Sequence, residues 1–522
     1  EKWGISVVSV YLNKMGKNLL AIKGVTRSHS KNKIPELLIQ THPFHISRII
    51  LLPIHQNTLK KTLLGNQFRF CHFLFIPDNS ETVDIKYARE KTTIFSIHVN
   101  QIKQSPFRTQ ASQNFLNSYN EPRKLFVSRK QSDKSTKRKQ KILFITHNLN
   151  IEGAPKVLFE IASAMVKTKR WQPIIFSQEE GPLSQEFEDL NIPIHLVTEV
   201  IEKSMADNCY DLKQKKFLAT IHILDQINPD IVFANTIVSS IAIAAAYERK
   251  IPAVWMIHES SYPSPIQNMQ SFCAHAENLQ AFLTAENIVF CAQSTMDIYK
   301  KFDFNGRFNL VKNAPSTSYE SVSTSPELKL KAKAILGIPS DNICLLNIGV
   351  IHENKNQLLI IKALQHINNK NVHLLLIGAR NNSPYLDKIK ETVINLNLEK
   401  QVSILSEDKN VHPYYQAADI YILPSRSESY PLTILEAMSF SLPILCTAVF
   451  GMNEQVKFNV NAYPISPDNE NDLAGKIAIL INDPGKRKQM GKKSKQIIDS
   501  LPKHRNMIEE HIKIIEQSQK HL

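Results

Sequence analysis

Short apolar runs alternate with amphipathic segments from about residue 141 to the end of the chain. Runs such as Ile142–Ile145 and Ile231–Ala234 have the length and continuity of strands that are buried on both faces. Between them, segments such as Ala154–Lys167 place apolar residues at helical spacing. Strands that alternate with helices are typical of parallel sheets with helical crossovers. The pattern therefore predicts an α/β fold.

The expected elements form two doubly wound sets. In the first set, strands are expected at Ile142–Ile145, Pro173–Phe176, Ile194–Val197, Ile231–Ala234, Val254–Ile257 and Ile288–Phe290, and helices at Gln185–Leu190, Leu212–Ile227 and Val238–Glu248. In the second set, strands are expected at Ile343–Ile348, His373–Ile377, Val402–Leu405 and Ile420–Leu423. We expect Rossmann-like domains at 141–315 and 316–482, followed by helices over 483–522.

The amino-terminal quarter follows a weaker pattern. Alternation in Phe68–Ile76 and Thr92–Val99 suggests short strands, so residues 1–127 could form a β-rich region whose function stays open. Residues 128–140 are polar and strongly basic with no apolar period, which is typical of a flexible linker.

The positive charge is concentrated in the same quarter. The chain has 522 residues and a net charge of +15; residues 1–140 hold 24 of its 63 Lys and Arg but 8 of its 48 Asp and Glu. The remainder holds 39 basic and 40 acidic residues and is nearly neutral. Residues 1–140 could contact an anionic membrane, an acidic polymer or nucleic acid, and a solvated surface explains the charge as well as these together. We do not expect a nucleic-acid partner.

Composition and cysteine spacing narrow the class of protein. With 43% hydrophobic residues and 14 glycines the chain can bury large cores, which excludes a fibrous or disordered class. Its six cysteines lie far apart with no Cys-x-x-Cys motif, which favours reduced thiols over a disulfide or zinc framework. No run of about 18 apolar residues and no signal-peptide pattern is present. We expect a cytoplasmic protein, with peripheral contact at the inner face of the cell membrane.

The motif with the clearest chemistry follows the apolar run Ile420–Leu423. After a polar loop, a segment of helical periodicity would begin near Pro431. Because the first N–H groups of a helix have no partner inside it, those of Leu432 and Thr433 would face a bound anion such as a diphosphate.

Two carboxylates, Glu428 and Glu436, frame this turn, and carboxylates can accept hydrogen bonds from the paired hydroxyls of a sugar or ribose. Together with Pro424-Ser425 before them and Pro443 after them, they resemble the donor site of the retaining glycosyltransferases of family four, also called glycosyl transferases group 1. The resemblance implies a GT-B fold, in which two Rossmann-like domains face a cleft and the terminal helices pack back on the first domain. It also implies that Glu428 lies beside the donor sugar and that Glu436 binds the nucleotide ribose.

Other positions of the first domain fit the same family less closely. Gly153 matches its glycine loop, where backbone approaches the donor phosphates, although Glu152 stands where another glycine is common. His258 resembles the family histidine that reaches the donor sugar. Asn313 matches the asparagine of an interdomain Asn-Gly link, with Ala314 in place of the glycine.

The second domain keeps one of the two cations that hold the diphosphate in the family. Gly349 and Lys355 match the pattern, but Val350 replaces the arginine. A lysine can still act as a point charge on phosphate. Arg426, in the Glu428 loop, could supply the missing cation.

The resemblance implies transfer of a sugar from a UDP or GDP sugar to an acceptor hydroxyl, with the anomeric configuration kept and without a metal or cofactor. The acceptor would be a glycan or a lipid-linked glycan in polysaccharide or glycolipid biosynthesis. Helix N–H groups and Lys355 would stabilise the leaving diphosphate. Catalytic roles are expected for His258, Glu428 and Lys355, and donor contacts for Gly153, Gly349, Lys355, Ser425, Tyr430, Leu432, Thr433 and Glu436. The departures at Glu152, Val350, Ala314 and Ser441 leave an alternative open: a non-catalytic GT-B module that binds sugar nucleotide weakly or not at all.

Overall fold

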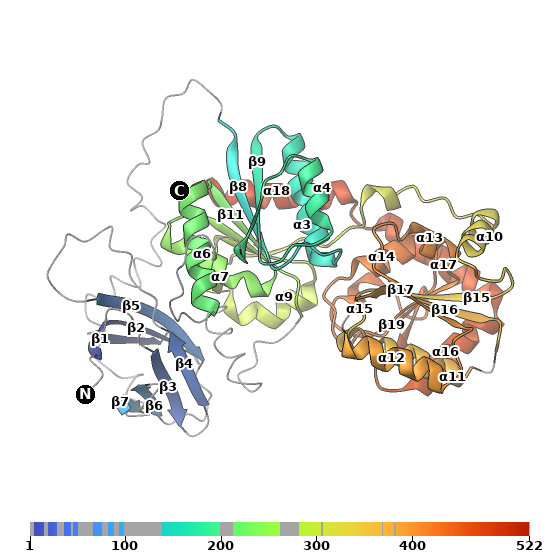
Figure 1. Cartoon of the computed structure of the whole chain (residues 1–522), viewed down its shortest axis with the longest axis horizontal. Helices are drawn as coiled ribbons and strands as arrows, with labels where there is room; N and C mark the ends of the chain where they lie inside the picture. Colours follow the sequence, from blue (N-terminus) through green and yellow to red (C-terminus); the bar gives the residue numbers. More distant parts are fainter. Residues whose placement is uncertain are drawn as a thin grey trace.

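The computed structural model describes residues 138–198, 212–260, 281–303, 306–367, 369–380 and 383–520, and the backbone of seven strands between residues 5 and 98. Most of the linker expected over 128–140 lies outside the described residues. The seven strands form two antiparallel sheets with the orders β1-β2-β5 and β4-β3-β6-β7 (Figure 1). They are β1 (Ile5–Lys14), β2 (Leu19–Ser28), β3 (Glu36–His42), β4 (His45–Ile50), β5 (Asn66–Phe75), β6 (Thr82–Tyr87) and β7 (Thr93–His98). The two predicted strands correspond to β5 and β7.

The next sheet is entirely parallel and has the order β10-β9-β8-β11-β12-β13-β14. Its strands are β8 (Gln140–Thr146), β9 (Trp171–Ser177), β10 (Ile194–Leu196), β11 (Ile231–Asn235), β12 (Ala253–Ile257), β13 (Asn287–Phe290) and β14 (Phe308–Leu310). Its helices are α3 (Gly153–Lys167), α4 (Leu183–Asp189), α6 (Leu212–Ile227), α7 (Ser240–Glu248) and α9 (Gln293–Tyr299).

Both faces of this sheet are covered, which explains its unbroken apolar strands. Alternate residues point to opposite faces: Phe144 and Phe233 pack in the core with α3, whereas Leu143 and Val232 pack in a second core with α6 and α7. The prediction of a doubly wound sheet is confirmed.

The second parallel sheet has the order β17-β16-β15-β18-β19-β20. Its strands are β15 (Ile343–Ile348), β16 (Val372–Ala379), β17 (Val402–Ser406), β18 (Ile420–Leu423), β19 (Ile444–Thr447) and β20 (Ala462–Ile465). Its helices are α10 (Pro326–Ile335), α11 (Gln357–Gln365), α12 (Pro384–Asn395), α13 (His412–Ala417), α14 (Leu432–Ser439), α15 (Met452–Gln455), α16 (Glu470–Asn482) and α17 (Pro484–Ser500). The helices again cover both faces (Figure 1).

The two terminal helices pack on different domains. Helix α17 lies against α14 and α16 of the second domain, whereas α18 (His504–Lys520) lies against α3, β11 and β12 of the first (Figure 1). The crossing back on the first domain that we expected of residues 483–522 therefore applies to α18. Inward-facing Ile514 and Ile515 are fully or almost fully buried there, so apolar burial holds the chain terminus on the first sheet.

Each parallel sheet has one point where the strand order reverses. In the first sheet the chain runs outward from β8 through β9 to β10 and then returns to β11 on the other side of β8. In the second sheet the same reversal lies between β15 and β18. Ligands of open α/β sheets bind outside the carboxyl ends of the strands at such points. The topology therefore selects the loops after β8, β11, β15 and β18 as the place for a site.

Candidate functional site

One cavity of about 530 Å³ is lined by the loops at both reversal points. The first domain contributes Gly153 and His258, and the second contributes Gly349, Lys355 and Glu428. Tyr430, Leu432, Thr433 and Glu436 complete the wall at the start of α14. All sequence-predicted site residues line this cavity except Ser425, which is fully buried beneath it.

The start of α14 offers backbone N–H groups to the cavity. Pro431 has φ −63° and ψ 127° and caps the helix, and its carbonyl oxygen accepts a hydrogen bond from Gln455 Nε2 at 2.9 Å. Helix α14 begins at Leu432, so the N–H groups of Leu432 and Thr433 have no acceptor within the helix. This geometry suits an anion and follows from the position of Pro431.

Lys355 and Glu428 form an ion pair in the same wall. Ser425 Oγ donates to Glu428 Oε1 at 2.9 Å, so the buried serine orients the carboxylate from below. The loops that carry the pair are joined by Arg426 N, which donates to the Asn354 carbonyl oxygen at 2.8 Å. Glu428, which we expect to bind the donor sugar, therefore contacts Lys355, which we expect to bind the phosphates.

Glu436 is held by a tyrosine that sequence reasoning did not find. The Tyr415 hydroxyl donates to Glu436 Oε2 at 2.7 Å, and Glu436 is 4% exposed. Burial, together with the adjacent Glu436 charge, raises the pKa of Tyr415 well above its usual range, so the phenol remains a donor. One carboxylate oxygen is fixed, and the carboxylate keeps further lone pairs for hydroxyls.

His258 is fixed as a neutral imidazole at the carboxyl end of β12. Its Nε2 lies 2.9 Å from Asn235 Oδ1, while Asn235 Nδ2 donates to the Ala154 carbonyl oxygen at 3.1 Å. Because the amide nitrogen is engaged, Oδ1 accepts and His258 carries its proton on Nε2, which leaves Nδ1 as an acceptor. Burial lowers the pKa of His258 to about 3, with His511 and His147 adding to the effect. His258 can therefore orient a hydroxyl but supplies no positive charge.

Two further features follow these strands, of which Thr236 was missed in the sequence. Glu259 Oε2 accepts hydrogen bonds from the N–H groups of Ile237 (2.9 Å) and His258 (3.0 Å), and burial raises the pKa of Glu259 to about 7. Thr236, which lines the cavity, has φ 76°, a strained conformation for a β-branched residue. Such strain commonly marks functional loops.

The donor-side loop packs directly on the first domain. The hydroxyl of Ser429 lies 2.7 Å from Ser260 Oγ and 3.0 Å from Thr295 Oγ1, and Asn313 Nδ2 donates to the Tyr430 carbonyl oxygen at 3.0 Å. These contacts are buried. They anchor the loop that carries Glu428 to the first domain.

The cation expected from Arg426 is not in the cavity. Arg426 Nη2 lies 2.7 Å from Asp468 Oδ1, outside the lining residues, so it does not replace the arginine missing at Val350. The cavity instead contains Arg380, which sequence reasoning overlooked. The signal was present, because Arg380 follows directly on β16 at the carboxyl edge of the sheet.

Within the described residues, no group of three or more His, Cys, Asp or Glu side chains is arranged to hold a metal ion. In the same part of the chain, no helix has both the length and the apolar character needed to cross a membrane.

Comparison with known sequences finds a family model that matches part of the second domain. Residues 329–497 match the family described as "Glycosyl transferases group 1". A glycosyltransferase of Haemophilus influenzae is 28% identical over 160 residues, which are 30% of this chain and 44% of that protein. A Campylobacter jejuni enzyme, GalNAc-alpha-(1->4)-GalNAc-alpha-(1->3)-diNAcBac-PP-undecaprenol alpha-1,4-N-acetyl-D-galactosaminyltransferase, is 24% identical over 366 residues, 68% of this chain and 93% of its own length. Other relatives, like the Haemophilus protein, are matched over less than half of their own length.

Solved structures give the fold. HepE of Anabaena in complex with UDP-glucose matches with a TM-score of 0.61 and 19% identity, covering 72% of this chain and 99% of HepE. WaaG, a glycosyltransferase involved in lipopolysaccharide biosynthesis, matches with a TM-score of 0.56 and 16% identity, covering 72% of this chain and 99% of WaaG. These likenesses, with the two parallel sheets, confirm the expected GT-B fold.

Proposed function

We propose, from the premise that residues 329–497 belong to the group 1 glycosyltransferases, that the chain moves a sugar from a nucleoside diphosphate sugar to an acceptor hydroxyl with retention of configuration. Family membership supports glycosyl transfer in general. The donor, the stereochemistry and the residue roles are our proposal, supported by the geometry of the cavity.

One observation carries the proposal: a single cavity collects a cation, a helix amino-terminus and a hydroxyl-binding carboxylate from the second domain, and Gly153 with His258 from the first. A diphosphate fits between Lys355 and the N–H groups of Leu432 and Thr433. For the ribose we propose Glu436, which lies about one turn into α14. Because the similar structure of HepE is a complex with UDP-glucose, UDP is the first nucleotide to test.

In the proposed step, the bond between the anomeric carbon and the diphosphate oxygen breaks while the acceptor oxygen bonds to the same face of that carbon. The acceptor proton passes to the leaving diphosphate oxygen. Lys355 and the α14 N–H groups stabilise the charge that develops there without requiring a metal ion. Glu428 and neutral His258 hold sugar hydroxyls and form no covalent bond to the sugar.

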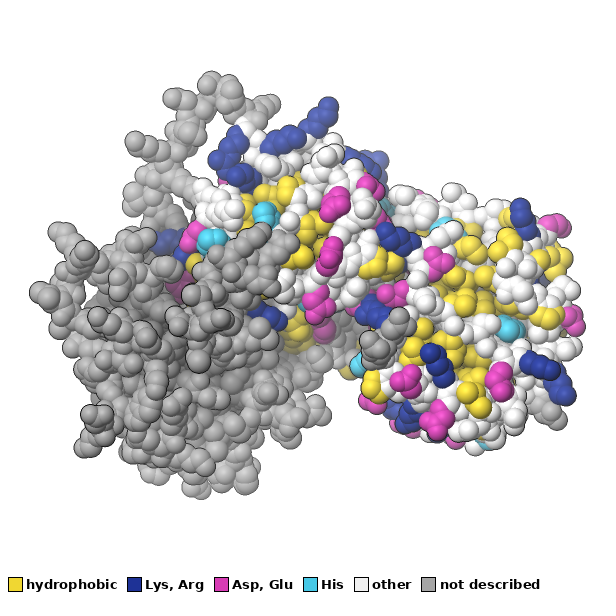
Figure 2. All heavy atoms as spheres, viewed as in Figure 1, with side chains coloured by type: hydrophobic (Ala, Val, Ile, Leu, Met, Phe, Trp, Pro, Cys, Tyr) yellow, Lys and Arg dark blue, Asp and Glu magenta, His cyan; other side chains and the backbone are white. Residues whose placement is uncertain are grey.

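For the acceptor we propose a glycan or lipid-linked glycan, in line with the undecaprenol-linked substrate named for the Campylobacter relative. Contact with an anionic membrane is proposed for residues 1–140 and the exposed basic side chains at the amino ends of β8 and β9, namely Arg138, Lys139, Lys167, Lys169 and Arg170. Figure 2 shows dark blue side chains gathered at this edge. Such contact should weaken with salt, so sedimentation with anionic and neutral vesicles at two salt concentrations tests it.

A screen of UDP and GDP sugars for release of free nucleotide tests the enzyme proposal. We expect wild-type protein to release nucleotide from one donor, Glu436→Ala to lose nucleotide binding and Lys355→Ala to lose turnover. Calorimetry with UDP and GDP tests the non-catalytic alternative, because a site that has lost its function should bind neither nucleotide. Wild-type rates in both variants would show that this cavity is not the donor site.

A further inference from the structure

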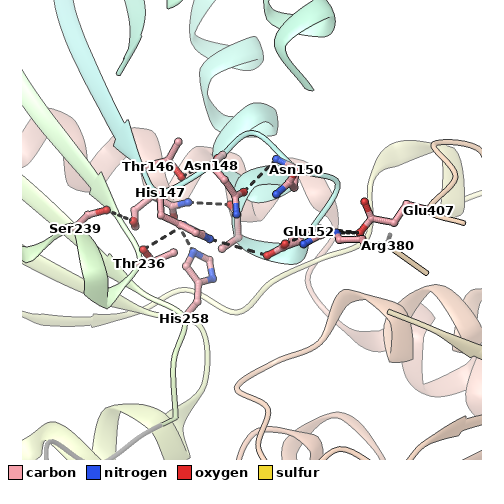
Figure 3. A network of polar contacts seen from close by, with 12 residues as sticks. Thr146, His147, Asn148, Asn150, Glu152, Thr236, Ser239, His258, Arg380 and Glu407 are labelled. Carbon is pink, nitrogen blue, oxygen red and sulfur yellow. Dashed lines mark hydrogen bonds and ion pairs between the residues drawn. The ribbon is translucent and has the colours of Figure 1, made fainter. Parts of the chain in front are cut away.

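Three charged side chains connect the two domains across the cavity. Glu152 precedes α3 in the first domain, whereas Arg380 follows β16 and Glu407 follows β17 in the second. Arg380 Nη2 lies 2.7 Å from Glu152 Oε1, and Arg380 Nε donates to Glu407 Oε1, also at 2.7 Å. Figure 3 shows the arginine reaching between the two carboxylates. All three residues line the cavity.

We propose that the Glu152–Arg380 ion pair is an ionic clasp that holds the two domains closed over the donor site, and that Glu152 is thereby a positioning residue. Glu152 stands directly before Gly153, in the loop expected to approach the donor phosphates. Its side chain makes no capping hydrogen bond to α3, so its carboxylate is not needed to start the helix. Its contact with Arg380 is therefore the main interaction that this carboxylate contributes.

The arrangement of charges lets the Glu152–Arg380 pair separate without leaving either charge buried and unpaired. Glu407 belongs to the same domain as Arg380 and stays paired with it when the domains separate. Arg380 is 33% exposed and Glu152 27% exposed, so water can solvate the released carboxylate. Loss of a buried partner would be far more costly. The contact is thus suited to repeated opening and closing rather than to permanent assembly.

Glu152 also connects to the first-domain side of the site. Its Oε2 lies 4.0 Å from His147 Nε2, and His147 Nδ1 lies 3.5 Å from Thr236 Oγ1, at the end of β11 (Figure 3). When Arg380 holds Glu152, the turns after β8 and β11 are drawn toward the second domain, which carries Lys355. This positioning step rests on the proposed function, whereas the closure itself does not.

A second ion pair between the domains supplies a matched control. Lys409 Nζ lies 3.1 Å from Glu186 Oε1, and these residues come from the second and first domains. Neither lines the cavity, and Lys409 is 48% exposed. If any ion pair between the domains favours closure, Lys409→Ala should open the domains as much as Glu152→Ala does. If the clasp is specific, only Glu152→Ala should open them.

The test measures domain separation in the full-length protein without ligand. Spectroscopic labels are introduced through non-natural amino acids at the exposed positions Lys167 and Lys390, because the chain already has six cysteines. We expect Glu152→Ala and Arg380→Ala to shift the distance distribution toward longer values. The ratio of closed to open molecules should fall about two- to fivefold, as for a partly exposed ion pair. Salt at 1 M should open the wild type to the same extent.

Charge reversal and kinetics separate positioning from simple structural support. The double variant Glu152→Arg/Arg380→Glu keeps one arginine and two carboxylates, so it should restore the closed distribution. With an active donor, Glu152→Ala should raise KM about two- to fivefold with kcat little changed, because bound donor itself bridges the domains. Lys409→Ala should leave both readouts near wild type. Identical distance distributions in wild type and Glu152→Ala at low salt, or a folded double variant that stays open, would overturn the clasp even if the protein transfers sugar.

Discussion

Removing the ammonium of Lys355 should separate two effects that the ion pair with Glu428 combines. Lys355 and Glu428 are 28% and 13% exposed, and in the described part of the chain Ser425 Oγ also donates to the Glu428 carboxylate, at 2.9 Å. Lys355→Ala removes one partner of this carboxylate, so the free energy of unfolding should fall by about 1–2 kcal/mol. It also removes a charge-assisted contact to a diphosphate, about 1.5–3 kcal/mol, so UDP affinity should fall roughly ten- to hundredfold.

The Glu428→Gln variant has the opposite expected effect on UDP. The amide keeps the shape of the side chain and can still accept from Ser425, but it no longer competes with phosphate for Lys355. UDP lacks the transferred sugar that Glu428 would hold, so it should bind equally or up to about fivefold more tightly. Transfer from a UDP sugar should fall, because the sugar loses a carboxylate ligand.

The double variant Lys355→Ala/Glu428→Gln decides between the two roles of the lysine. Titration calorimetry with UDP and urea unfolding are measured on all four proteins as a double-mutant cycle. Stability should return toward wild type in the double variant, because no unpaired carboxylate remains. UDP affinity should stay as low as in Lys355→Ala. Recovery of UDP affinity would mean that Lys355 only neutralises Glu428, and the proposed role in donor binding would be refuted.

Three further predictions concern the surrounding loops. Glu436→Gln should keep the hydrogen bond from the buried tyrosine, and hence stability, but weaken UDP binding about tenfold by calorimetry; unchanged affinity would contradict the ribose role. Glu259 keeps its proton to about pH 7 in the folded protein and to about 4.5 when unfolded, so this residue binds more protons in the folded state, and its own contribution to stability should fall by about 3 kcal/mol as pH rises from 4.5 to 7. In Glu259→Gln this fall should disappear from urea titrations, and an equal slope would contradict the assignment. Gly378 has φ +125°, and a Cβ there would lie 2.3 Å from a carbonyl oxygen of the neighbouring turn. Gly378→Ala should therefore lower the free energy of unfolding by about 1–3 kcal/mol. The control is Gly475→Ala, where a Cβ would lie in open space on α16.

The parts of the fold that follow from local pattern were predictable from the sequence. Strands β15 and β18 and helix α6 have the predicted bounds, because buried parallel strands and amphipathic helices leave periodic signals within a few residues. The first turn of the helix expected at Val238–Glu248 is instead a 3-10 turn, Ile237–Ser239, before α7. The strained Thr236 backbone precedes it, and tertiary packing of this kind has no signal in periodicity.

The candidate site was predictable where its residues share one turn and hidden where they meet by folding. Leu432 and Glu436 are adjacent to an apolar strand and a proline, so their positions could be read directly. Arg380 and Glu152 are 228 residues apart in the chain, and only the approach of the two domains brings their charges together. For the same reason the sequence suggested Arg426 as the compensating cation, although its closest carboxylate in the fold is Asp468.

The pairing of charges inside the cavity explains how an acidic pocket can accept an acidic ligand. Lys156, Lys355 and Arg380 line it together with six carboxyl groups, namely Glu152, Glu259, Glu407, Asp408, Glu428 and Glu436. Each carboxyl group has a donor within the protein: an ion-pair partner, a tyrosine hydroxyl, or backbone N–H. Three of the six are paired with a cation: Glu428 with Lys355, and Glu152 and Glu407 with Arg380. The repulsion of a diphosphate by these three is reduced, because paired charges of opposite sign act weakly at a distance. In the mechanism that we propose, donor binding is an exchange of partners at Lys355, in which phosphate takes the place of Glu428 and the freed carboxylate turns to the sugar.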